Sequence, residues 1–238
     1  MKIKAILFDF DGTLSDLVPR WIQPVVEAIK QIRPDLTNDF IRNAFTEHSK
    51  KIIQASTGFS PFLAIRIIWV IGKVVGLNFL QRIKLLHLLK DKKEDFKKIT
   101  PFPDTVFTIR SLSQMGYKLG LISTASRETL KEAITIIPDL TWFSLIITRD
   151  DVLQTKPDPE PFEKAMREMN LKNSECIYVG DLPVDVEGAK NAKIKSVLVL
   201  RQWGDSILEQ FPEIKPDLII NELGDLINLA HVGFKCFI

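Results

Sequence analysis

The stretch that decides the fold reads Ile6-Leu7-Phe8-Asp9-Phe10-Asp11-Gly12-Thr13-Leu14, an apolar run that stops on two carboxylates and a glycine. Such a run is typical of a strand buried in a parallel sheet, and open α/β sheets place their ligands just beyond the carboxyl ends of their strands. Side chains two residues apart in an extended chain point the same way. We therefore expect Asp9 and Asp11 to reach one small volume, where two anions favour a hard divalent cation.

Strand and helix signals alternate along the chain from Pro103 onward. This alternation predicts an α/β fold, a Rossmann-like parallel sheet with helices on both faces. The predicted strands cover residues 117–122, 144–148, 176–179, 196–200 and 217–220, and the predicted helices cover 104–115, 127–137, 159–169 and 184–191.

The segment before Pro103 has a different pattern, because residues 19–98 lack short β-branched runs between turns. Their apolar spacing predicts helices instead. We expect residues 1–17 and 99–238 to form the α/β core and residues 18–98 to form an inserted all-helical domain. The predicted helices run from Trp21 to Ile32, from Thr37 or Asn38 to His48, from Pro61 to Val75 and from Phe79 to Lys90.

One apolar segment, Phe62 to Leu80, approaches the roughly 20 residues that span a bilayer. Arg66 and Lys73 interrupt it, and a charge near the middle of a span costs about 2.5 to 3.5 kcal/mol. We favour a buried or partner-facing helix, expect no membrane partner, and leave open whether this segment is domain core or an interface.

Composition excludes several classes of protein. With 238 residues and 45% hydrophobic content, the chain can bury a full core. Its net charge of +2 gives no strong field for nucleic acid. Cys176 and Cys236 are too few for a disulfide framework, and no signal peptide precedes the first strand, so we expect a cytoplasmic protein. The sequence leaves open whether it is a monomer or a homodimer.

Polar groups follow two further predicted strands. Ser123 and Thr124 come directly after the strand that ends at Ile122, where hydroxyls and backbone amides near a helix start can bind phosphate. The same residues are ordinary helix caps, so this signal is weak alone. Lys156 lies between a strand and three prolines that stiffen the chain, which makes it a better phosphate ligand than most lysines.

Two more acids follow the strand that ends at Gly180. Asp181 comes directly after it, and Asp185 lies four residues later at a predicted helix start. Asp185 alone fits a first-turn acid that faces the helix dipole. Asp181, placed beside Asp9, needs a counter-cation, and we predict it as a metal ligand.

Taken together, the sequence resembles the haloacid dehalogenase-like (HAD) hydrolase superfamily. The matching motifs are, in order, Asp9-Phe-Asp11-Gly12-Thr13, then Ser123, then Lys156, then Gly180-Asp181 with Asp185. The helical insertion after the first motif is similar to the cap domain of the phosphoglycolate phosphatase-like branch.

The resemblance implies a Mg²⁺-dependent phosphatase that acts on a small phosphorylated metabolite. Asp9 would be the nucleophile that forms an aspartyl phosphate, and Asp11 the general acid and base. Gly12, Ser123, Thr124 and Lys156 would bind the phosphate. The Mg²⁺ site would consist of Asp9, the backbone carbonyl of Asp11, Asp181 and, through its water shell, Asp185.

Several alternatives stay open at this point. A phosphosugar mutase would keep every core residue, whereas a dehalogenase has no need of Asp11, and a non-catalytic binding protein has no need of the acids. Phosphoglycolate leads by resemblance, with sugar phosphates, nucleotides and pyrophosphate behind it. Arg20, Arg42 and His48 are candidates for substrate contacts, although each is an ordinary surface residue by default, and His87 among leucines suggests packing.

Overall fold

The computed structural model describes residues 2–56, 62–92 and 94–235 and divides into two compact units. The first, which we call the α/β unit, comprises Met1–Asp16, Ile99–Gln202 and Glu213–Ile238. The second, which we call the helical unit, comprises Leu17–Lys98 and Trp203–Pro212.

Within the described residues, the α/β unit contains one six-stranded parallel sheet in the order β3-β2-β1-β4-β5-β6. The strand order reverses between β1 and β4, and such a reversal is where open α/β sheets bind ligands. Phe8 at the end of β1 pairs with Leu121 of β2 and Val179 of β4. The strands are β1 Ala5–Phe8, β2 Lys118–Ile122, β3 Leu145–Ile147, β4 Cys176–Gly180, β5 Lys195–Val199 and β6 Leu218–Ile220.

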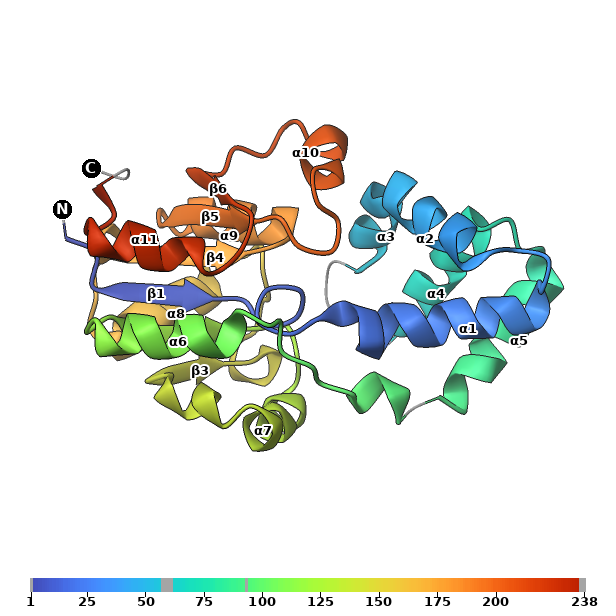
Figure 1. Ribbon diagram of the computed structural model, residues 1–238, viewed down its shortest axis with the longest axis horizontal. Coiled ribbons are helices and arrows are strands. Elements are labelled where there is room, and N and C mark those ends of the chain that lie inside the picture. Colours follow the sequence, from blue (N-terminus) through green and yellow to red (C-terminus); the bar gives the residue numbers. More distant parts are fainter. Residues whose placement is uncertain (1, 57–61, 93, 236–238) are drawn as a thin grey trace. The chain divides into compact units, whose positions relative to one another are not determined.

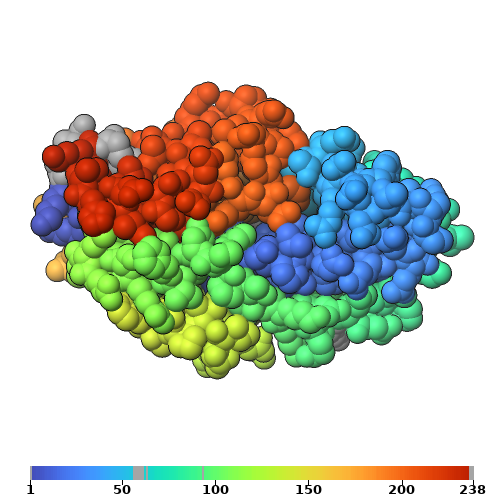
Figure 2. Space-filling model, in the orientation of Figure 1, coloured from blue at the N-terminus to red at the C-terminus, as the bar shows by residue number. Residues whose placement is uncertain are grey.

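Helices cover both faces of this sheet (Figure 1). They are α6 Thr105–Gln114, α7 Arg127–Ile136, α8 Glu160–Met169, α9 Pro183–Asn191 and α11 Asp225–His231, with 3₁₀ turns at Pro138–Trp142, Arg149–Asp151 and Asn173–Glu175. Because side chains alternate along a strand, Ile6 and Phe8 of β1 pack with α6, α7 and α11, whereas Ala5 and Leu7 pack with α8 and α9. In the space-filling view, the green residues of α6 and the red residues of α11 lie side by side over the near face (Figure 2).

This architecture confirms the predicted fold class, and the five strands predicted after Pro103 are all present. Helix α11 was not predicted. Its seven residues are too few to show a clear apolar period, yet Leu226 and Ala230 are buried in the core beside α6.

The helical unit is built around its own apolar core. Its helices are α1 Gln23–Ile32, α2 Asn38–Glu47, α3 Ser49–Ser56, α4 Leu63–Val74, α5 Phe79–Lys90 and α10 Ser206–Gln210, with a π-helical turn at Val18–Ile22 and a 3₁₀ turn at Asp95–Lys97. Side-chain caps fix two of the starts: Thr37 accepts a hydrogen bond from the amide of Phe40, and Asn78 and Gln81 form a capping box.

Helix α3 was not predicted either. The sequence after His48 is polar, Ser49-Lys50-Lys51, and predicts that the helix ends there. His48 does leave the helical conformation, but the chain re-enters a helix at once, because Ile52 and Ile53 are buried in the helical unit. Packing therefore outweighs the weak local signal.

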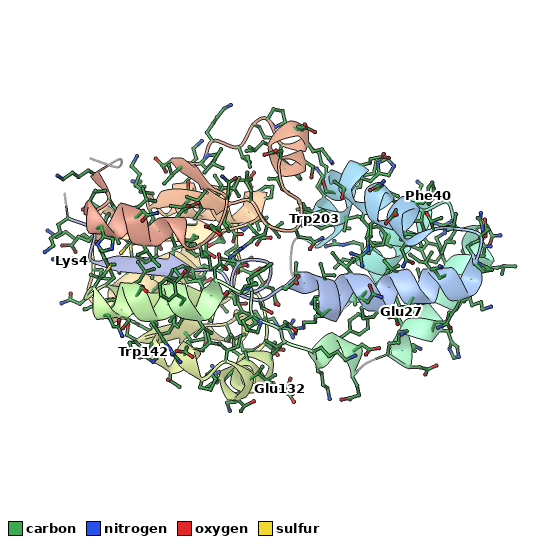
Figure 3. The ribbon with its side chains drawn as sticks, viewed as in Figure 1. Lys4, Glu27, Phe40, Glu132, Trp142 and Trp203 are labelled. Atoms are coloured by element: carbon green, nitrogen blue, oxygen red, sulfur yellow. The ribbon has the colours of Figure 1, made fainter. Side chains whose placement is uncertain are left out.

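The segment 203–212 belongs to the helical unit and not to the α/β core that its sequence predicts. Trp203 packs against the apolar core of the helical unit (Figure 3). The Gln210 side chain donates to the carbonyl of Thr46 at 2.7 Å and accepts from the amide of Lys50 at 2.9 Å. These contacts join positions about 160 residues apart, so no local pattern predicts them.

The apolar segment 62–80 forms parts of two helices rather than one. Helix α4 ends at Val74 and α5 begins at Phe79, with Gly76 in the left-handed region at φ +77° between them. Pro61, the predicted start of the first helix, lies outside the described residues. Within those residues, no helix is both long and apolar enough to cross a bilayer.

Candidate active site

Three acids and one lysine meet beyond the carboxyl ends of β1 and β4. Asp9 follows β1, Asp181 follows β4, and Asp185 lies in the first turn of α9. One carboxylate oxygen from each lies within 4.8 Å of the others, and all three residues are buried. Lys156 reaches them from the loop before α8, where its peptide bond to Pro157 is cis.

Lys156 lies at the centre of this group and is 5% exposed. Its Nζ donates hydrogen bonds to Asp9 Oδ1 at 2.6 Å, to Asp185 Oδ1 at 2.7 Å and to the hydroxyl oxygen of Tyr178 at 2.8 Å. Burial alone would lower the pKa of Lys156, but the charges of Asp185 and Asp9 outweigh it and raise that pKa. The ammonium group is therefore charged at neutral pH and has all three protons in use.

One cation is too little charge for three buried carboxylates. Burial, together with the nearby charges of Asp185 and Asp11, raises the pKa of Asp9 to about 7, although Lys156 acts in the opposite direction. Burial and the charges of Asp185 and Asp9 also raise the pKa of Asp181 well above its usual value. In the protein alone, burial first and then repulsion between the carboxylates thus disfavour the ionised forms of both acids.

The donor set fits a divalent cation. Among the described residues, Asp181 Oδ2 is a buried oxygen without a hydrogen-bond partner, in a cluster of carboxylate oxygens, which are the ligands that Mg²⁺ prefers. Asp185 is already engaged by both oxygens: Oδ1 accepts from Lys156 and Tyr178, and Oδ2 accepts from the amide of Leu182 at 2.9 Å. Asp9 and Asp181 are therefore the better candidates for direct ligation.

Two glycines allow the acids to come this close. Gly12 adopts φ +91°, and a Cβ there would overlap the carboxylate of Asp181. A Cβ at Gly180 would overlap Asp185 in the same way. Thr13 completes the arrangement, since its hydroxyl donates to Asp181 Oδ1 at 3.2 Å.

Asp11 is placed differently from the other acids. It is half-buried, lies outside β1 in a bridge with Ser15, and does not belong to the cluster of three carboxylates. It lies close enough to Asp9 for its charge to raise the pKa of Asp9. This position suits a group that exchanges protons with a ligand rather than one buried against a cation.

Ser123 and Thr124 lie at the end of β2. Ser123 is 5% exposed, and its Oγ accepts a hydrogen bond from the amide of Ala125 at 3.0 Å. Thr124 is exposed. Both line a small pocket together with Lys156 and Thr148. Ser123 therefore closes a local turn, whereas the N-cap of α7 is Ser126, so the capping interpretation is wrong for Ser123. The pocket brings both hydroxyl residues to the same place as Lys156.

Two further residues of this site give no signal in the sequence. Tyr178 of β4 is fully buried, and its hydroxyl contacts Lys156, Asp185 and, at 3.2 Å, the carbonyl of Ile122. Arg201 after β5 bonds Asp104 at 2.8 Å and contacts the carbonyl of Thr13 at 3.5 Å. In the sequence, Tyr178 is one more aromatic residue in an apolar strand, and nothing local distinguishes Arg201 from a surface arginine.

Comparisons with known proteins agree with this geometry. The family model of haloacid dehalogenase-like hydrolases matches residues 6–199, a range that contains every predicted site residue. The chain is 34% identical over 240 residues to the pyrophosphatase PpaX of Halalkalibacterium halodurans, covering 98% of this chain and 99% of that protein. It is 27% identical over 231 residues to the PpaX of Bacillus mycoides, covering 95% and 96% of the two chains.

A crystal structure of another protein has a similar fold. A predicted phosphoglycolate phosphatase from Haemophilus somnus superimposes with a TM-score of 0.71 over 97% of this chain and 99% of that one, at 19% sequence identity. An identity this low bears on the fold alone. The family model and the full-length relative at 34% identity bear on the family as well, and they confirm the resemblance seen in the motifs. This chain therefore belongs to the haloacid dehalogenase-like hydrolases and is a phosphatase.

Proposed function

We propose that this enzyme is a Mg²⁺-dependent phosphatase that transfers the phosphoryl group of a small metabolite to Asp9 and then to water. The observation that carries this proposal is the pairing of Lys156 with Asp9 beside Asp181, whose Oδ2 is buried without a partner. Phosphoryl transfer needs a nucleophile, positive charge and a proton donor in one place; we assign these roles to Asp9, Lys156 and the neighbouring Asp11.

In the first step, a carboxylate oxygen of Asp9 attacks phosphorus and the bond from phosphorus to the leaving oxygen breaks. Asp11, which is half-buried, gives its proton to the leaving oxygen. In the second step, Asp11 takes a proton from water, the water oxygen attacks phosphorus, and the bond between Asp9 and phosphorus breaks. Free phosphate leaves, and both carboxyl groups return to their starting state.

Lys156 keeps Asp9 positioned and ionised for the attack, because its ammonium group holds Oδ1 at 2.6 Å. Ser123, Thr124 and the backbone amides near Gly12 are proposed as donors to the phosphate oxygens. The backbone carbonyl of Asp11 and the side chains of Asp9 and Asp181 would hold the cation, and Asp185 would act through the water molecules bound to it. The bound cation would neutralise the excess negative charge and let a phosphate dianion approach the carboxylates.

We propose the helical unit as the cap that selects the leaving group. The residues of this unit that the sequence suggests for substrate contacts differ in how free their side chains are to bind one. Arg20 is buried and donates from Nε to the carbonyl of Phe96 at 2.7 Å, so a structural role fits it. Arg42 donates to Gln23 at 2.8 Å. His48 and His87 make no contact that assigns either of them to a substrate.

Two substrate classes lead. A phosphoglycolate-like monoester is proposed from the motifs. Pyrophosphate is the second candidate, because the full-length relatives at 34% and 27% identity are pyrophosphatases. The two share one reaction, since in both Asp9 attacks phosphorus and Asp11 gives its proton to the leaving oxygen.

The proposal is tested by phosphate release from phosphoglycolate, pyrophosphate, sugar phosphates, nucleotides and an aryl phosphate, with Mg²⁺ and with a chelator. We expect release that requires Mg²⁺ and that the chelator abolishes, and the panel then ranks the substrates. Isomerised sugar phosphate without free phosphate would instead establish a mutase. Folded protein that releases phosphate from none of these compounds would contradict the proposal.

A further inference from the structure

The α4–α5 hairpin of the helical unit carries an unusual combination of charge and exposed apolar surface. Between Glu47 and Asp91 the sequence has no aspartate or glutamate. The chain as a whole has nearly equal numbers of acidic and basic residues, so its positive charge is concentrated in this segment. The basic residues of the segment are Lys50, Lys51, Arg66, Lys73, Arg82, Lys84 and Lys90.

Large apolar side chains of the same hairpin face solvent. Leu80 is 74% exposed and Phe79 is 58% exposed at the start of α5, and Ile83 one turn later is 46% exposed. On α4, Ile65 is 48% exposed. The inner side of α5 is fully apolar as well, because Leu85 and Leu89 are buried against the rest of the unit. Helix α5 is thus apolar on two sides, and only one of them is needed for its own fold.

The exposed side chains of α4 and α5 form one surface. The rings of Trp69 on α4 and Phe79 on α5 are in edge contact, with centroids 5.4 Å apart. The guanidinium of Arg82 stacks over the Trp69 ring at 4.4 Å. Ile65 lies one turn from Trp69, and Ile83 one turn from Phe79, so all of these side chains share a face. We call this surface, made of Ile65, Trp69, Phe79, Leu80 and Ile83, the hairpin patch.

The positive charge surrounds the hairpin patch. Lys84 and Lys90 are exposed on α5, as is Lys73 on α4. Of the nearest acids, Glu27 of α1 is paired with Lys92 at 2.7 Å, and Asp91 is one acid against the three exposed lysines. A second copy of the same patch would bring like charges together, which argues against a self-complementary interface.

We infer that the hairpin patch docks the enzyme on an anionic phospholipid surface, with the apolar side chains in the headgroup region and the lysines on lipid phosphates. An exposed apolar strip next to lysine and arginine, with tryptophan beside it, is what such a surface favours. Each basic side chain near an anionic membrane adds to the attraction, so several act together. No spanning helix is needed for this mode of binding.

The test is flotation of the whole protein with vesicles of phosphatidylcholine and phosphatidylglycerol, compared with pure phosphatidylcholine. We expect binding to the mixed vesicles that is lost at high salt, and little binding to the neutral ones. The double variant Leu80→Asp with Ile83→Asp and the double variant Lys84→Glu with Lys90→Glu should each reduce binding about tenfold or more.

Matched controls come from the α/β unit. Leu153 is 89% exposed, and Lys131 is exposed on α7, so Leu153→Asp and Lys131→Glu should bind vesicles like the wild type. Circular dichroism should show that every variant is folded, and release of phosphate from a soluble substrate should be unchanged by the hairpin variants. A protein that lacked phosphatase activity but bound the vesicles would contradict the proposed function and leave this inference intact.

Three results would overturn the inference. The first is equal binding, or none, to both kinds of vesicle. The second is a wild-type dimer that Leu80→Asp with Ile83→Asp converts to a monomer without any vesicle binding, which would make the patch a self-interface. The third is a fall in kcat/KM on a soluble substrate in the hairpin variants together with unchanged vesicle binding, which would make the patch part of substrate selection.

Discussion

The ammonium group of Lys156 lies 2.6 Å from Oδ1 of Asp9, although 147 residues separate the two in the chain. The pair is almost fully buried, with 3% and 7% of the two side chains exposed. A buried ion pair contributes little net stability, but the loss of one partner leaves the other charge uncompensated. We therefore expect the loss of this ion pair to affect both the stability of the protein and its catalysis.

Lys156→Met should reduce phosphate release by at least about 100-fold, because Asp9 loses the charge that keeps it ionised and in place. The same change should lower the free energy of unfolding by about 3 to 5 kcal/mol, since Asp9 and Asp185 stay buried without a cation. Steady-state kinetics and denaturant unfolding measure the two effects. Lys131→Met on the exposed face of α7 is the control and should change neither.

Gly12→Ala should abolish most activity, because the added Cβ meets the Asp181 carboxylate and because φ +91° is strained for alanine. Gly116→Ala separates the two causes. Gly116 has a similar φ of +86°, but no atom lies within 4 Å of its would-be Cβ. We expect Gly116→Ala to cost about 1 to 2 kcal/mol of stability with normal kcat. Equal loss of kcat in both variants would contradict this account.

Tyr178→Phe should lower kcat while KM changes little. The change removes the hydroxyl oxygen that accepts from Lys156 and the single hydroxyl proton that Asp185 Oδ1 and the carbonyl of Ile122 share, each at 3.2 Å. The unpaired groups should cost about 1 to 3 kcal/mol of stability. Phe162→Leu is a useful comparison, because it disturbs the ring contact of Tyr178 without touching the polar network. If Tyr178→Phe lost only stability, the hydroxyl would have no role in positioning Lys156.

Asp151 should stabilise the folded protein only at pH values at which its carboxyl group is ionised. Burial opposes ionisation, but hydrogen bonds from Thr148 and Arg127 outweigh it, and the pKa of Asp151 is lowered. A lowered folded pKa means that the stabilisation is present above the unfolded pKa of about 3.9 and is lost as pH falls through the folded value.

Asp151→Asn should therefore reduce stability at pH 7 by about 1 kcal/mol and have a smaller effect near pH 2. Thermal unfolding across this pH range measures the difference from the wild type. Asp158→Asn is a control on the same segment of chain. A difference that does not shrink at low pH would contradict the charge-based explanation.

The sequence predicts most of the sheet because an apolar run followed by a turn is a local signal. Asp9, Asp181 and Lys156 could be predicted because a parallel sheet brings strand ends together, whatever their separation in the chain. Tyr178 could not, because its hydroxyl matters only once Lys156 lies against it. The place of residues 203–212 in the helical unit also depends on contacts made after folding, such as that between Gln210 and Thr46.

The proposed mechanism requires Asp9 to carry the phosphoryl group. We would quench Asp11→Asn protein with acid after mixing it with Mg²⁺ and the aryl phosphate, and analyse its peptides by mass spectrometry. The aryl leaving group departs without a proton from Asp11, and the variant lacks the base for the second step. We therefore predict a phosphorylated peptide with the modification on Asp9, absent when Asp9→Asn is added. Phosphate release by Asp9→Asn at the wild-type rate, with no phosphorylated aspartate in either protein, would contradict the account.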